Sequence, residues 1–161
     1  MNFSIIFVIF LLFSVGTGNE RVLPLLMPEV STDRIQEDSY LCTAYATNPN
    51  EAEFITEFKP NASSAESLHH IMIIGCETLS EPEAETEQGY VWDCKYDPEK
   101  SCGSGRQTVL YAWSKNAPTY TLPDGVGFKV GGDTKINYLV LHIHYFNLNP
   151  DQSKRISLKI F

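Results

Sequence analysis

Histidine occurs at four positions in this 161-residue sequence, and the four residues form two pairs. His69 and His70 are adjacent in the apolar run LHHIMIIGC, while His142 and His144 are one residue apart in NYLVLHIHYF. Neutral imidazole is a common metal ligand, and a site made only of imidazoles suits copper or zinc. The two pairs therefore indicate a metal site. The competing interpretation is a mixed, solvent-facing surface on which a His-x-His pair has no function.

Both pairs lie on predicted strands. In NYLVLHIHYF, alternation places His142 and His144 on one face, and the opposite face is predicted to form core with Leu139, Leu141, Ile143 and Tyr145. Adjacent residues on a regular strand point to opposite faces. His69 and His70 can therefore address one ion only if the strand ends or bulges there.

The rest of the chain also predicts strands, at residues 52–59, 107–113, 125–130 and 155–161, which are rich in β-branched and aromatic residues. In the first of these, alternation predicts one face with Phe54, Thr56 and Phe58 and the other with Ile55 and Glu57. No segment shows a long helical period, and the acidic stretch EPEAETEQ is predicted to be a solvated loop. The pattern predicts one all-β domain, an antiparallel β-sandwich of two packed sheets.

Charge and the N-terminal segment limit the classes of partner and compartment. A formal net charge of −8 argues against nucleic acid as a partner, because a phosphate backbone requires clustered Lys and Arg. Residues 1–18 contain an apolar run too short to span a bilayer and end in small residues, which predicts a cleaved signal peptide followed by a domain at 19–161. An uncleaved signal anchor is the alternative.

The mature domain is then expected in the secretory pathway, either secreted or in the lumen of a secretory granule, without a transmembrane segment. Asn61 begins a glycosylation sequon, Asn-Ala-Ser. In an oxidising compartment, an even number of cysteines predicts disulfides, here two, with three pairings open. A zinc site is the competing use, but no Cys-x-x-Cys spacing supports it. The cysteines are Cys42, Cys76, Cys94 and Cys102.

Several segments together resemble a known family. HHIMIIGC resembles the first copper signature of the ascorbate-dependent type II copper monooxygenases, and LPLLMPEV, DSYLC, EFKP, LYAWSKNAP, LPDGVGFKVGGDT and YLVLHIHY resemble further family segments in the same order. The resemblance covers about residues 22–161. Within the signature, Ile71 and Ile74 stand where the family usually has Met and Phe, and both keep the position apolar.

The resemblance implies a jelly-roll-like sandwich, the first of two such domains, with one copper held by His69, His70 and His144. His142 stands where the family typically has Gln, so it is either a polar neighbour of the copper or a ring that points past it. The same alignment implies the disulfide pairs Cys42 with Cys94 and Cys76 with Cys102.

Among the branches of the family, GVGFKVGGD and LYAWSKNAP are most similar to the peptidylglycine α-hydroxylating enzymes. That branch implies hydroxylation of the α-carbon of a C-terminal glycine with oxygen and ascorbate, and the copper site here would deliver an electron. The second copper and the pocket for glycine-extended peptide are expected beyond Phe161, so the chain alone is expected to hold no catalytic residue and to be inactive. The alternatives are the dopamine β-monooxygenase branch, a secreted copper-binding module without catalysis, and a metal-free disulfide-bonded sandwich.

Overall fold

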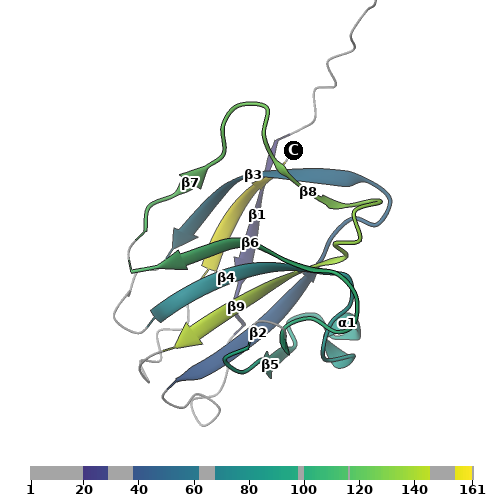
Figure 1. The fold of residues 1–161 in the computed structure, drawn as a ribbon, viewed down its shortest axis with the longest axis vertical. Coiled ribbons are helices and arrows are strands. Elements are labelled where there is room, and N and C mark those ends of the chain that lie inside the picture. Colours follow the sequence, from purple (N-terminus) through teal and green to yellow (C-terminus); the bar gives the residue numbers. More distant parts are fainter. Residues whose placement is uncertain are drawn as a thin grey trace, which may run out of the picture.

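Two antiparallel sheets make up the molecule (Figure 1). The structure is a computed structural model and describes residues 20–28, 38–61, 68–97, 100–115, 117–145 and 155–160. Sheet A has the order β1 (Arg21–Leu26), β10 (Arg155–Ile160), β3 (Ala52–Asn61) and β7 (Tyr120–Thr121), and β8 (Phe128–Gly131) also pairs with β3. Sheet B has the order β5 (Val91–Asp93), β2 (Ser39–Ala46), β9 (Tyr138–Tyr145), β4 (Leu68–Cys76) and β6 (Gln107–Ser114). The predicted antiparallel β-sandwich is confirmed.

The main core lies between the sheets. Sheet A contributes Ile55 and Phe58 of β3, and sheet B contributes Ile73 of β4 and Leu141 of β9, all four with no exposed surface. The Phe58 ring stacks on the Tyr111 ring of β6 at a centroid distance of 4.6 Å. Apolar burial of this kind is the dominant favourable contribution to folding. It holds β9 and β4 as neighbouring strands in the interior of sheet B.

A second, smaller cluster covers the other face of sheet B. It contains both disulfides and packs Ala84 against its edge, and its buried members are Cys42, Ile74, Cys76, Leu79, Trp92, Cys94, Cys102 and Val140. Ala84 belongs to α1 (Glu83–Thr86), a single helical turn inside the acidic stretch predicted as a loop. The stretch is polar and mostly exposed as predicted, but it closes one turn with a backbone bond from Glu87 to the Glu83 carbonyl.

The faces of β3 differ from the prediction. Ile55 and Phe58 are both buried in the core, while Phe54 is 43% exposed. The pairing of β3 with β10 explains this, because Ile55 pairs with Ile160 and Glu57 with Lys159, so that β3 has one extra residue between the two pairs. The alternation predicted for this strand is therefore wrong, and the register shift is the reason.

Four strands were not predicted from the sequence: β1, β2, β5 and β7. The strand β1 contains Pro24, which a sheet tolerates on an edge strand. Asn61 ends β3 and is exposed, whereas the rest of its sequon and the predicted signal peptide lie outside the described residues. Within the described ranges, no helix has the length and apolar character needed to cross a membrane.

Candidate metal centre

A bulge in β4 brings His69 and His70 to the same side of the sheet. Along β9, His144 and Tyr145 are consecutive, but their partners on β4 are His70 and Leu68, so β4 contains one extra residue at His69. A bulge of this kind changes the side to which the following residues point. The Nδ1 atoms of the two rings lie 3.1 Å apart. The condition set by the sequence, a bulge at the histidine pair, is met.

The β-ladder supplies the third imidazole. His144 of β9 pairs directly with His70 of β4, and the two ring centroids are 5.0 Å apart. The rings of His69 and His144 have centroids 4.9 Å apart. Each of the three histidines offers a ring nitrogen within 4.8 Å of those of the other two. The structure therefore brings together the three histidines named from the sequence.

These donors fit a copper ion. Two nitrogens bound to one ion at about 2.0–2.1 Å each can be at most about 4.2 Å apart, and the His69 and His70 Nδ1 atoms satisfy that limit. The Nδ1 atom of His144 is buried and has no hydrogen-bond partner among the described residues. Buried polar atoms in proteins are nearly always paired, so this nitrogen is available to a partner from outside the polypeptide, such as water or a metal ion. Imidazole donors without thiolate or carboxylate suit copper.

Two of the three rings, those of His70 and His144, are in surroundings that favour the neutral form of imidazole, the form that binds metal. Burial, with the His144 and His69 rings as further causes, lowers the pKa of His70 to about 4. Burial also lowers the pKa of His144, a shift that its hydrogen bond to Asp38 opposes. The Tyr40 ring stacks on the His144 ring at a centroid distance of 4.0 Å and an angle of 12°. The imidazole of His144 is therefore held between its own strand and β2.

His142 lies beside this cluster and outside the set of three. Its side chain is fully buried, which contradicts the alternative of a solvent-facing His-x-His pair. Its Nδ1 is 3.1 Å from the Ser101 hydroxyl oxygen, and its ring stacks on the His70 ring with centroids 5.9 Å apart. Burial, with the His70 and His144 rings as further causes, lowers its pKa to about 4. Its Nε2 is buried without a hydrogen-bond partner among the described residues.

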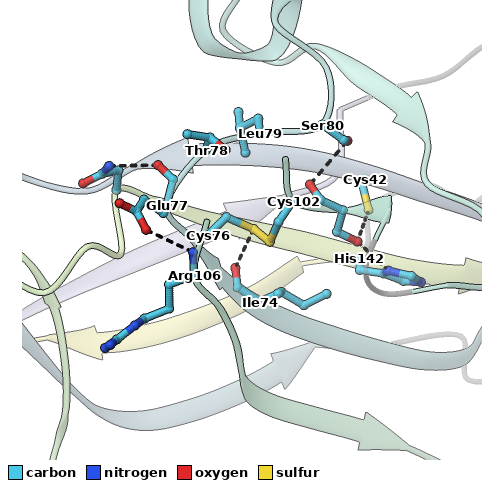
Figure 2. Close-up of a disulfide and its surroundings, with 12 residues drawn as sticks. Cys42, Ile74, Cys76, Glu77, Thr78, Leu79, Ser80, Cys102, Arg106 and His142 are labelled. Atoms are coloured by element: carbon cyan, nitrogen blue, oxygen red, sulfur yellow. Dashed lines mark hydrogen bonds between the residues drawn. A yellow bond between two sulfur atoms is a disulfide. The ribbon is translucent and has the colours of Figure 1, made fainter. Parts of the chain in front are cut away.

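One disulfide blocks a second group of side chains that could otherwise bind a metal ion. Cys42, Cys94 and His142 have donor atoms within 4.8 Å of one another, but Cys42 and Cys94 are bonded together. The other disulfide joins Cys76 to Cys102, with Cys42 and His142 nearby (Figure 2). These are the two pairs that the family resemblance implies. In their oxidised form the two sulfurs are structural groups, since the thiolate is the form that binds metal.

Sequence analysis did not identify three residues that contact these histidines, namely Asp38, Tyr40 and Ser101. Asp38 immediately precedes β2 and adopts a left-handed backbone conformation, with φ of 59°, which Asp tolerates better than most residues. Its Oδ1 is 3.2 Å from His144 Nε2. Tyr40 is the cross-strand partner of His144 in the pairing of β2 with β9. Predicting that contact would have required the register of two strands distant in sequence.

Comparison with known proteins agrees with this geometry. Residues 23–152 match the family described as copper type II ascorbate-dependent monooxygenase, N-terminal domain. The chain is 33% identical over 139 residues to peptidyl-glycine alpha-amidating monooxygenase A of Xenopus laevis, a match covering 85% of this chain and 13% of that protein. It is 36% identical over 132 residues to the peptidylglycine alpha-amidating monooxygenase of Rattus norvegicus, covering 82% of this chain and 12% of that protein.

The chain thus spans only 12–14% of the length of such relatives, while each match includes most of the chain itself. The family match extends over both histidine pairs and all four cysteines. From the matched residues and the cluster that they form, the chain belongs to the copper type II ascorbate-dependent monooxygenase family, as an N-terminal domain.

Proposed function

We propose that this chain is the N-terminal, copper-binding and electron-transferring part of a peptidylglycine α-hydroxylating monooxygenase, and that His69, His70 and His144 are its copper ligands. The relatives are named for peptidyl-glycine α-amidation, and this supports the choice of branch. The observation that carries the ligand assignment is the convergence of three ring nitrogens, one of them buried without a partner among the described residues.

The residues of this chain would perform distinct tasks. The bulge in β4 presents two imidazoles side by side, and His144 adds the third from β9. Burial keeps His70 and His144 neutral, and Tyr40 covers one face of the His144 ring. His69 is the exposed member of the set, so the site is accessible from its side. Bound copper would supply one-electron redox chemistry, with ascorbate as the reductant.

Copper binding by single-site variants tests the ligand assignment. We expect the purified chain to bind one copper, measured by metal analysis and by competition with a chromophoric Cu(I) chelator. We expect copper affinity to fall more than about 100-fold in each of the variants His69→Ala, His70→Ala and His144→Ala. This loss is larger than that expected for a residue that only hydrogen-bonds to a ligand. His142→Ala is the matched control and should keep the copper. Loss of copper in that control, with His144→Ala still loaded, would show that the ligand assignment is wrong.

The reaction proposed for the complete enzyme is hydroxylation of the α-carbon of glycine-extended peptide with oxygen and ascorbate. We propose that the present chain alone does not catalyse it, because its described residues contain one open imidazole cluster, and the second group is closed by a disulfide. The test supplies the copper-loaded chain with ascorbate, oxygen and a glycine-extended peptide. Stoichiometric hydroxylated product would place the catalytic centre within this chain.

A chimera separates this proposal from a copper-binding module without catalysis. The chain would replace the matching segment of the Rattus norvegicus relative, and amidating activity would be measured. Activity supports an electron-transferring role, because the rest of the relative is unchanged. A folded, copper-loaded chimera without activity would favour the binding module.

We further propose that the chain acts in the secretory pathway, because its described cysteines are all in disulfides and Asn61 is exposed at the end of β3. Expression in a secreting animal cell tests this. The expected product is found in the medium, and its mass falls on deglycosylation only when Asn61 is present, with Asn61→Gln as the control. Retention of the unglycosylated chain in the cytosol would contradict the proposed location.

A further inference from the structure

The two ring nitrogens of His144 have different surroundings. Nε2 lies 3.2 Å from Oδ1 of Asp38, whose side chain is 71% exposed. Nδ1 is buried and without a hydrogen-bond partner among the described residues. A carboxylate accepts hydrogen bonds and does not donate them, so the nitrogen facing Asp38 carries the proton. In the neutral ring, the lone pair is then on Nδ1.

The orientation of this ring is restricted. The His144 side chain is only 7% exposed, and the Tyr40 ring stacks on it almost in parallel. Turning the ring over would move Nε2 away from Asp38, the one carboxylate in contact with this ring among the described residues. Asp38 immediately precedes β2 and stands two residues before Tyr40. One short segment thus supplies both the stacking ring and the carboxylate.

We infer that Asp38 is a positioning residue for the copper site: its carboxylate holds His144 as the Nε2–H tautomer, so that His144 binds copper through Nδ1. This inference rests on the proposed function, because it assumes that His144 is a ligand. Carboxylates and carbonyls that accept the second N–H of a ligating histidine fix its tautomer and raise its basicity, and their loss commonly lowers metal affinity about 10–100-fold.

The negative charge has an effect separate from the hydrogen bond. A nearby carboxylate stabilises the higher charge of Cu(II) more than that of Cu(I), because the interaction grows with the charge of the ion. Asp38 therefore lowers the reduction potential of the site and strengthens Cu(II) binding. It would set how readily the site accepts an electron from ascorbate and passes it on.

Two substitutions separate the hydrogen bond from the charge. Asp38→Asn keeps an oxygen that can accept from Nε2–H but removes the charge, so the tautomer should persist while the reduction potential rises. Asp38→Ala removes both, so Cu(II) affinity should fall about 10–100-fold. Asp133→Asn is the matched control. Asp133 is exposed and lies in the turn before β9, at the opposite end of that strand from His144, and it is paired with Lys129 of β8. The affinity and potential of this control should equal those of the unaltered chain.

Nitrogen-15 NMR of the metal-free chain reads the tautomer directly, without copper. The expected result is a proton on Nε2 of His144 in the unaltered chain and in Asp38→Asn, and a mixed population in Asp38→Ala. A proton on Nδ1 in the unaltered chain would overturn the inference. So would equal potentials and Cu(II) affinities for both Asp38 variants and the Asp133→Asn control.

The outcomes distinguish this inference from the proposed function. If the unaltered chain binds copper and loses it in His144→Ala, but the Asp38 variants behave as the control does, only the role of Asp38 is overturned. If the unaltered chain binds no copper at all, the proposed function fails and this inference fails with it. Circular dichroism and titration of free thiols confirm that each variant compared is folded with both disulfides intact.

Discussion

The two faces of sheet B are made by the same strands and differ in what holds them together. Toward sheet A, β4 and β9 present aliphatic side chains that belong to one large cluster, namely Ile71, Ile73, Leu139, Leu141 and Ile143. On the other face, the same two strands present His70, His142 and His144. The first face depends on volume and apolar area, whereas the second depends on the position of individual nitrogen atoms.

The comparison teaches that the histidine face is not a solvent face. His142 and His144 have exposed fractions of 0% and 6%. Two disulfides and Ser101 take the place that a second sheet occupies on the aliphatic side. The packing between the sheets and the candidate metal centre therefore lie on opposite sides of one layer, and substitutions on each side should have separable effects on copper binding.

The largest expected loss of stability is on the aliphatic side. Leu141 is fully buried between the sheets, so Leu141→Ala should lower the free energy of unfolding by about 2–5 kcal/mol through lost burial and the cavity left behind. Copper affinity of the molecules that remain folded should change little. Urea denaturation and copper titration measure the two quantities. Val109→Ala, on an exposed position of β6, is the control, and equal destabilisation by the two variants would contradict the assignment of the core.

The next effect is on the histidine side. Replacing both Cys42 and Cys94 by Ala should lower the free energy of unfolding by about 2–4 kcal/mol, because the bridge restrains the unfolded chain over a sequence separation of 52 residues. The change also removes the sulfur atoms that contact Ser101 and His142. Thermal unfolding of the oxidised protein and of the double variant gives the comparison. Unchanged stability would mean that the second cluster does not depend on this bridge.

Lowering the pH should reduce the free energy of unfolding of the metal-free domain, through His142 on the histidine face of sheet B. Buried His142, which faces Tyr40, His70 and His144, has a pKa of about 4 when folded, against an ordinary value near 6.5 when unfolded. Between these values the unfolded chain binds a proton that the folded chain does not, so stability is lost as pH falls from about 6.5 toward 4. The loss reaches about 3 kcal/mol for a shift of that size.

Urea denaturation of the chelator-treated protein at several pH values measures this slope, and His142→Gln is the control because it removes the titrating ring. If the free energy of unfolding of His142→Gln falls with pH as steeply as that of the unaltered domain, the acid sensitivity belongs to other groups. This pH dependence of stability is opposite to that of a histidine paired with a carboxylate, because the contribution of such a pair to stability grows as the pH falls.

The smallest effect concerns one hydroxyl group. Ser101 is fully buried and lies within hydrogen-bond distance of His142 Nδ1, so Ser101→Ala removes the hydroxyl partner of that nitrogen and leaves only the weak contact with the Cys94 sulfur. The expected cost is about 1–3 kcal/mol in the free energy of unfolding, with copper binding retained. Chemical denaturation and metal analysis test both parts. If the variant loses its copper at full stability, Ser101 belongs to the metal site and the separation of the two functions is incomplete.

For β9 and β3, which were both predicted as strands, the assignment of residues to faces was correct only where the register is regular. β9 has no register shift against its neighbour β2, and its inward and outward residues were assigned correctly from the sequence. β3 contains an extra residue at Thr56, and there the same reasoning failed for Phe54 and Ile55. Bulges change the face without changing composition, which explains why period-two analysis cannot locate them.

The histidines of the candidate site were predictable, and their supporting contacts were not. His69, His70 and His144 are identified by residue type and by resemblance to a family. Asp38 and Ser101 are common residue types in loops, and their contacts depend on pairings separated by 106 and 41 positions in sequence. Only the folded sheet brings them to the imidazoles.

The histidine pair on one side of β4 depends on the one extra residue at His69. Deleting that one codon would place Leu68 next to His70 and restore regular pairing against Tyr145 and His144, with Leu68 still facing the core. The strand would then carry one outward imidazole instead of two. An ordinary strand and a strand with two adjacent imidazoles on one side are therefore separated by a single in-frame insertion, which is a short evolutionary step and a simple way to introduce a candidate metal-binding pair into an existing sheet.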